Sequence, residues 1–185
     1  MKKSFSLFLL TYLTLVSCGY HSGQGSIPDL YQTISIPYVQ GDVEGDLTAA
    51  LVKQFSLSGG LQYSQRSGEL ILKVKVVDLR EENIGFRYDR EKDGELDHTI
   101  IPTEMRMTIF AEFVVCDSYS GEQILGPIII SASKDFDHDY YTSRDGVNIF
   151  SLGQLTDVDD AKDGIQEPLH QELAKKIVEY VNEAW

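Results

Sequence analysis

The sequence predicts an α+β domain in which two helices pack on one face of a four-stranded mixed sheet, in the order β-α-β-β-β-α. Two observations support this prediction. Apolar and polar residues alternate over 69–79 and 104–117, which is the period of a strand with two different faces. Apolar residues recur every three or four positions over 46–58 and near the C-terminus, which is the period of a one-faced helix.

The first strand is expected over 33–40, where Ile34, Ile36 and Tyr38 share one face. Pro37 has no N–H to donate to a neighbouring strand, so this strand is expected at an edge or with that nitrogen facing outward.

The first helix is expected to begin near Gly45-Asp46 and to end at Gly59-Gly60. Its apolar stripe contains Leu47, Leu51 and Phe55, with Ala50 beside them. One stripe can cover only one surface, so this helix is expected on one face of the sheet.

The second and third strands, 69–79 and 104–117, are joined across the turn signal Asp93-Gly94 and are expected to extend toward it as a long hairpin. A fourth strand follows Ser120-Gly121 and is interrupted by Pro127, which fits an edge or a bulge. After a long polar connection over 135–163, the last helix carries Pro168 in its first turn and runs to the C-terminus. Its apolar stripe consists of Leu169, Leu173, Ile177 and Val181.

Two one-faced helices leave the other face of the sheet uncovered. That face is expected to be polar or mixed and to meet water or a partner; its expected members are Lys73, Lys75, Arg106, Thr108 and Glu112.

Residues 1–17 are typical of a lipoprotein signal peptide, with Lys2 and Lys3 before a 12-residue apolar stretch that is too short to span a bilayer. The stretch ends in Leu15-Val16-Ser17-Cys18, which resembles a bacterial lipobox, so Cys18 is expected to become the first mature residue and to carry acyl chains. An ordinary secretory signal with a chance cysteine is the alternative. Absence of Asp at position 19 favours the outer membrane in the bacterial sorting pattern that this resembles.

The mature chain is then expected to consist of a lipidated flexible tether over 18–29 and a single domain over 30–185. Acylation of Cys18 leaves Cys116 without an intrachain partner, and its apolar surroundings in the sequence indicate a buried, inert thiol.

The chain has 16 basic and 29 acidic residues and a formal charge of −13 at pH 7, and removal of Lys2 and Lys3 with the signal changes this to −15. Such a balance argues against a nucleic-acid partner and against peripheral attachment to anionic lipid. A protein kept monomeric by like charge is the plain alternative.

We find no motif that indicates an enzyme: the sequence lacks a Gly-x-Ser-x-Gly elbow, a phosphate-binding glycine loop and a His-Glu-x-x-His pair. Metal sites are not expected either. The cluster Asp137-His138-Asp139 would point its side chains to opposite faces of a strand. The calcium-like run that starts at Asp89 has Ile100 at its twelfth position, where a bidentate Glu is required. The sequence therefore predicts no catalytic residue, no metal site and no cofactor.

Three short motifs occur in a fixed order: Cys18-Gly19-Tyr20-His21, Ile36-Pro37-Tyr38 and Leu47-Thr48-Ala49-Ala50-Leu51. Together they resemble the lipopolysaccharide-assembly lipoprotein family (LptE type), and the order of predicted elements resembles that family over nearly all of the mature chain. The resemblance implies a lipoprotein that sits as a plug inside the outer-membrane barrel delivering lipopolysaccharide to the cell surface. It also implies that the protein helps the barrel to assemble and contacts the exported lipid.

Members of that family are credited with basic residues that meet the phosphates of lipid A, whereas this chain is acidic. The densest basic group of the mature chain is Arg87, Arg90 and Lys92, before the expected hairpin turn. This group is the candidate for a lipopolysaccharide contact; the alternative is a set of solvated ion pairs with Asp89, Glu91 and Asp93. A lipid-tethered periplasmic module that binds a small ligand or peptide is the other functional hypothesis.

Overall fold

The computed structural model describes residues 26–90, 96–138, 143–144, 147–148 and 158–184, and it has the expected α+β architecture. The helices are α2 (Ile27–Leu30), α3 (Asp46–Ser58) and α4 (Val158–Glu183). The strands are β1 (Thr33–Ser35), β2 (Gln62–Tyr63), β3 (Leu70–Arg90), β4 (Leu96–Asp117), β5 (Gln123–Asp137), β6 (Ser143–Arg144) and β7 (Val147–Asn148).

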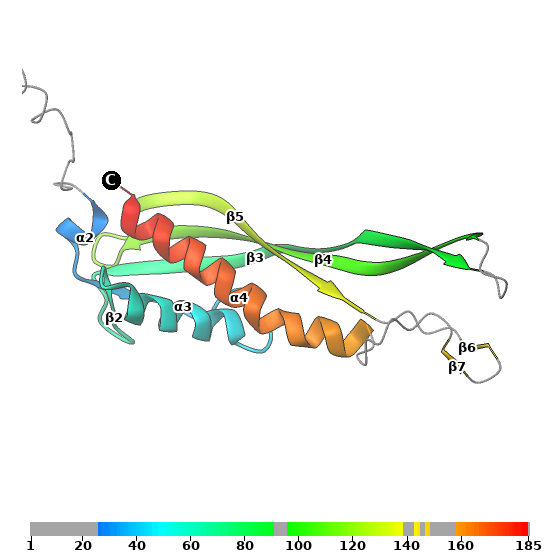
Figure 1. Cartoon of the computed structure of the whole chain (residues 1–185). Coiled ribbons are helices and arrows are strands. Elements are labelled where there is room, and N and C mark those ends of the chain that lie inside the picture. The colour runs from blue at the N-terminus through cyan, green and yellow to red at the C-terminus, as the bar shows by residue number, and fades with distance from the viewer. Residues whose placement is uncertain (1–25, 91–95, 139–142, 145–146, 149–157, 185) are drawn as a thin grey trace, which may run out of the picture.

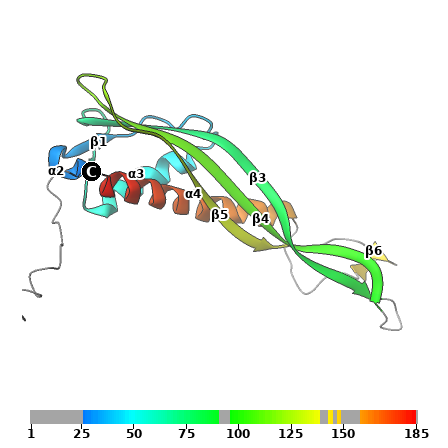
Figure 2. The same ribbon diagram turned by 90° about the horizontal axis from the view of Figure 1, so that it is seen from above.

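The main sheet has five strands in the order β2-β1-β3-β4-β5, and β6 and β7 form a separate pair. Strand β1 pairs in parallel with both β2 and β3, whereas β3, β4 and β5 are antiparallel, so the sheet is mixed as expected. Helices α3 and α4 lie on one side of this sheet (Figures 1 and 2). The expectation of four strands and two helices was incomplete, because α2 and β2 are too short to produce a periodic pattern.

Strand β1 corrects the expectation of an edge strand over 33–40. It ends at Ser35 and lies between two neighbours, so Pro37 falls beyond the strand and its missing N–H removes no ladder bond. The chain returns to the sheet at Gln40, whose N–H donates to the carbonyl of Val74 at 3.0 Å and whose carbonyl accepts from Val76 at 2.9 Å.

Helix α3 has the expected bounds. Its flanking glycines, Gly45 and Gly59, both have positive φ angles of 88° and 71°, which a residue with a Cβ adopts only with strain. Within these bounds the apolar stripe faces inward, and Leu47, Leu51 and Phe55 are all buried in the core.

Helix α4 begins at Val158, ten residues before Pro168, so that proline lies inside the helix rather than in its first turn. Pro168 removes one backbone bond, to the carbonyl of Gly164. Tertiary contacts hold the extra turns: Ile165 packs against the core, and the ammonium of Lys162 pairs with Glu81 at 2.5 Å. Local sequence signals gave the wrong start because they contain neither of these contacts.

The core lies between the two long helices and the sheet. It includes Leu72, Val74, Ile109, Ala111 and Phe113 from the sheet, Leu51 and Phe55 from α3, and Leu169, Leu173, Ile177 and Val181 from α4. Phe113 also meets the ring of Tyr180 edge-on, with centroids 5.8 Å apart.

The first buried residue of the described chain, Ile27, lies within the range 18–29 that was expected to be a tether. Ile27 is buried, and its N–H donates to the carbonyl of Ala184 at 3.1 Å, which joins α2 to the end of α4. Residues 18–25 lie outside the described residues.

The β3–β4 hairpin extends beyond the helices, and its far end lies opposite to α2 and the C-terminus (Figure 1). Register shifts between Val76 and Asp78 and between Asn83 and Gly85 interrupt its ladder. Such bulges bend a strand and increase its twist, which fits the curvature of the hairpin in Figure 2.

Candidate partner-binding face

The face of the sheet opposite the helices is formed by β3, β4 and β5 and is hereafter the open face. Leu72 and Val74 point into the core, so Lys73, which lies between them, and Lys75, which follows Val74, lie on the open face, and both are exposed. Glu112 is the cross-strand partner of Lys75, and Arg106 and Thr108 follow on the same side of β4 at two-residue spacing. The five residues expected on this face are therefore together on it.

Two cross-strand pairs connect β4 to β5 on the open face. Arg106 makes a bidentate contact with Asp135, Nε to Oδ1 at 2.6 Å and Nη2 to Oδ2 at 2.8 Å, and both side chains remain about two-fifths exposed. The hydrogen bond from Arg106 lowers the pKa of Asp135 and raises that of Arg106 itself. Next to this pair, the hydroxyls of Thr108 and Ser133 are 2.9 Å apart.

Arg80 extends the polar character of the open face onto β3. Its guanidinium lies 4.8 Å from the ring centroid of Phe110, and its Nε donates to Asp78 at 2.7 Å. Exposed pairs of this kind contribute little to stability, about 0 to 1 kcal/mol each. The open face is thus a mixed, hydrogen-bonding surface and not a second hydrophobic core.

A shallow groove of about 510 Å³ crosses the open face near the start of β3, between Tyr38, Lys73, Lys75 and Gln123. Cys116 lines this groove and is buried, as expected for an inert thiol.

The described part of the hairpin end is apolar as well as basic. Phe86, Tyr88 and Ile100 are more than half exposed, and Tyr88 is the cross-strand partner of Ile100. Of the three expected contact residues, Arg87 is half-buried. The side chain of Arg90 and the whole of Lys92 lie outside the described residues, as does Cys18.

The sequence reasoning missed Asp42, which is 6% exposed. Its Oδ1 accepts from the backbone N–H groups of Gly45 at 3.2 Å and Leu47 at 3.4 Å. Its Oδ2 accepts from the N–H and the hydroxyl of Thr48, at 2.8 and 2.6 Å. Asp42 therefore caps α3 from outside the helix, a role that an Asp upstream of the Gly45-Asp46 start could have suggested.

Within the described residues, no three His, Cys, Asp or Glu side chains lie close enough together to hold a metal ion. No helix in this part of the chain is long and apolar enough to cross a membrane.

Asp117 shapes the β4–β5 turn next to the groove. Its Oδ1 accepts from the N–H groups of Tyr119 and Ser120, both at 2.8 Å, and the backbone hydrogen bond from Ser120 is the main reason why its pKa is lowered. Ionised Asp117 therefore stabilises the fold at pH values above the ordinary aspartate pKa of about 4. That contribution is lost as the pH falls through the lowered folded-state pKa.

We expect Asp117→Asn to make the thermal unfolding temperature less dependent on pH below about 4, because the variant has no charge to lose at this turn. Thermal unfolding between pH 2 and pH 7, followed by circular dichroism, measures this. Parallel curves for the two proteins would show that Asp117 does not contribute to acid stability.

Comparison of the chain with models of known protein families identifies one matching family. Residues 31–182 match the LptE family, whose description is lipopolysaccharide-assembly. A search of curated protein sequences finds no match to this chain.

Two similar solved structures are a minor lipoprotein from Acinetobacter baumannii and the rare lipoprotein B from Shewanella oneidensis. The first is 16% identical over 82% of this chain and 91% of its own, with a TM-score of 0.46. The second is 14% identical over 81% and 90%, with a TM-score of 0.43.

Proposed function

The chain belongs to the LptE family of lipopolysaccharide-assembly proteins, and from this we propose that it is an outer-membrane lipoprotein that plugs and helps to assemble the barrel that inserts lipopolysaccharide at the cell surface. This role is structural and not enzymatic. The observation that favours a plug is the open face, which none of the described helices covers and which is polar and mixed. The lumen of a large transmembrane barrel is polar too, so the two surfaces match in character.

The proposed anchor is an acylated Cys18 on the periplasmic side of the outer membrane. The described chain begins next to the end of α4, because Ile27 bonds to Ala184, so the anchor segment enters at the end of the molecule opposite to the hairpin. The first described residues therefore lie at the opposite end of the molecule from the hairpin, which would leave the hairpin accessible to a barrel.

The full lipoprotein, extracted in detergent, is expected to co-purify with a large outer-membrane barrel that mass spectrometry identifies. We expect Thr108→Trp to reduce the recovered barrel about tenfold or more, the scale of a central interface contact, because the indole would project from the middle of the open face. Tryptophan is well tolerated in strands, so the domain should still fold.

Ser56→Trp is the matched control, because it adds the same group to an exposed position on α3. Equal barrel recovery from both variants would mean that the open face is not the interface. A monomer that brings no barrel with it and binds a metabolite would instead support a tethered ligand-binding module.

Lipopolysaccharide itself is the second proposed partner, met by Arg87, Arg90 and Lys92 at the hairpin. The support is that Arg87 lines one shallow hollow of the hairpin together with Phe86, Tyr88 and Ile100, so basic and exposed apolar groups occur in the same region, as an amphiphile with a phosphate would require. The acidic character of the chain opposes this contact.

We expect replacement of Arg87, Arg90 and Lys92 together by Ser to weaken lipopolysaccharide binding about tenfold or more, because hydrogen bonds to charged groups are worth about 1.5 to 3 kcal/mol each. The same triple change at Lys53, Arg66 and Lys175 is the control for lost charge, and binding is measured with the full-length lipoprotein. Unchanged lipid binding would eliminate this site. Loss of the barrel with lipid binding intact would identify the hairpin as an insertion element of the plug.

A further inference from the structure

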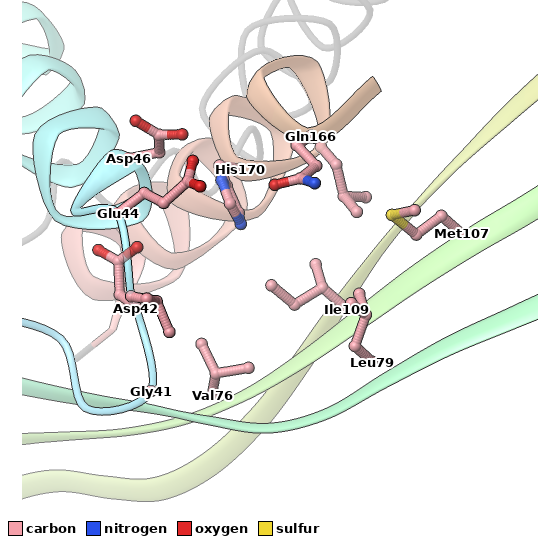
Figure 3. A pocket seen from close by; sticks show the side chains of 12 residues that line it. Gly41, Asp42, Glu44, Asp46, Val76, Leu79, Met107, Ile109, Gln166 and His170 are labelled. Carbon is pink, nitrogen blue, oxygen red and sulfur yellow. The ribbon is translucent and has the colours of Figure 1, made fainter. Parts of the chain in front are cut away.

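A pocket of about 240 Å³ lies on the helix side of the sheet, where the loop before α3 meets β3, β4 and the middle of α4 (Figure 3). Its volume is below the 300 Å³ or so at which pockets for drug-sized ligands begin. The pocket is therefore suited to a single long side chain or a group of that size. It is separate from the open face and from the hairpin end.

The floor of this pocket is apolar but incompletely covered. Met107, Ile109 and Leu169 are buried, whereas Leu79 is 52% exposed, although it pairs across the strands with Ile109 on the helix side. Burial of apolar area stabilises a complex. An alkyl group placed over Leu79 would complete the core at this position.

The rim is negative and contains a buried ring nitrogen that is available for a hydrogen bond. Glu44 and Asp46 are exposed and have no ion pair within the described part of the chain, whereas the carboxylate of Asp42 is already occupied by the start of α3. The ring of His170 points into the pocket (Figure 3). Its buried Nδ1 has no hydrogen-bond partner among the residues that the structure describes. The amide of Gln166 lies beside it.

We propose that this pocket binds an alkyl-stemmed cation, the chemistry of an arginine or lysine side chain, presented by a protein partner. The stem packs on Leu79 and Ile109, and the charged head reaches Glu44 and Asp46, as such side chains do when they bury their stems and keep their heads in water. Nδ1 of His170 can accept an N–H of the head when the proton of the ring is on Nε2. The inference does not depend on the plug role, since it uses none of the residues of the open face.

The chemistry is tested with the full-length chain and Nα-acetyl-arginine amide as the probe, followed through the methyl NMR signals of Met107 and Ile109. The norleucine analogue, which has an alkyl stem but no charge, is expected to bind about fivefold more weakly or worse, the effect of one exposed charge contact. Equal binding of the two probes, or no change in these methyl signals, would overturn the proposal.

Two variants and one charge control separate the effect of charge from the effect of pocket shape. Glu44→Gln with Asp46→Asn should weaken the arginine probe about fivefold or more, while Glu122→Gln with Glu183→Gln, which removes the same charge elsewhere, should change it less than about twofold. Leu79→Trp keeps every acid and should abolish binding by filling the pocket. An unaltered affinity in Leu79→Trp, with the fold intact by circular dichroism, would overturn the pocket as the site.

A photo-crosslinking residue at Val43, which is 93% exposed on the rim, tests whether the cation belongs to a protein. In cells, the expected adduct is a peptide of one protein with an Arg or Lys near the crosslink, and Leu79→Trp should remove it. Binding of the arginine probe without any protein adduct would overturn the partner and leave a free small cation as the ligand.

Discussion

Leu51→Ala is expected to lower the free energy of unfolding by about 2 to 5 kcal/mol, which is the cost of deleting a buried leucine and leaving a cavity. Leu51 is fully buried in the middle of α3, in the core between the helices and the sheet. The free energy of unfolding of a domain is a small difference between large opposing terms, about 5 to 15 kcal/mol. The expected loss is therefore a large part of the total. Urea unfolding followed by circular dichroism measures it.

Leu57→Ala is the matched control in the same helix, because Leu57 is 69% exposed. An exposed leucine has little apolar area to lose, so the change should be within about 0.5 kcal/mol. Similar losses in the two variants would mean that α3 is not packed against the sheet as the structure shows.

Asp42→Ala is expected to destabilise the protein by about 1 to 3 kcal/mol, because it leaves buried donors at the start of α3 without an acceptor. The carboxylate accepts four hydrogen bonds from Gly45, Leu47 and Thr48. The helix has no other side-chain cap, since its N-cap residue is Gly45. Thermal and urea unfolding measure the loss.

Asp46→Ala tests whether this effect is specific to Asp42. Asp46 is exposed in the first turn of the same helix, where a negative charge stabilises the helix dipole by about 0.3 to 1 kcal/mol. If Asp46→Ala cost as much as Asp42→Ala, the buried hydrogen bonds of Asp42 would not be the cause.

The elements that the sequence predicted well are those with long, uninterrupted periods. Helix α3 has both a clear stripe and a glycine at each end, so its bounds follow from local rules. Strands β3 and β4 were expected to extend toward Asp93-Gly94 as a long hairpin, and they do. Regular alternation alone marked only 69–79 and 104–117, because the register shifts between Val76 and Asp78 and between Asn83 and Gly85 interrupt the pattern.

The details of the open face were less predictable, although its main members were. The contact between Arg106 and Asp135 depends on the register of β4 against β5, which shifts between Phe113 and Val115 near the turn. Counting residues from Ser120-Gly121 does not reveal such a shift. The pocket between the loop before α3, the sheet and α4 was not predicted, because its lining residues come from a loop, two strands and α4 and are up to about 130 positions apart in the chain.

The length of the β3–β4 hairpin limits where its two ends can be in a cell envelope. At about 3.3 Å per residue, the 21 residues of β3 span up to roughly 65 to 70 Å. A bilayer with its headgroups measures only about 40 to 45 Å. If acyl chains at Cys18 hold the other end of the molecule in one leaflet, the hairpin can extend beyond the full thickness of that membrane or far into the compartment beside it. With that anchor, the attachment and the hairpin of one molecule would lie at two different depths and in different surroundings.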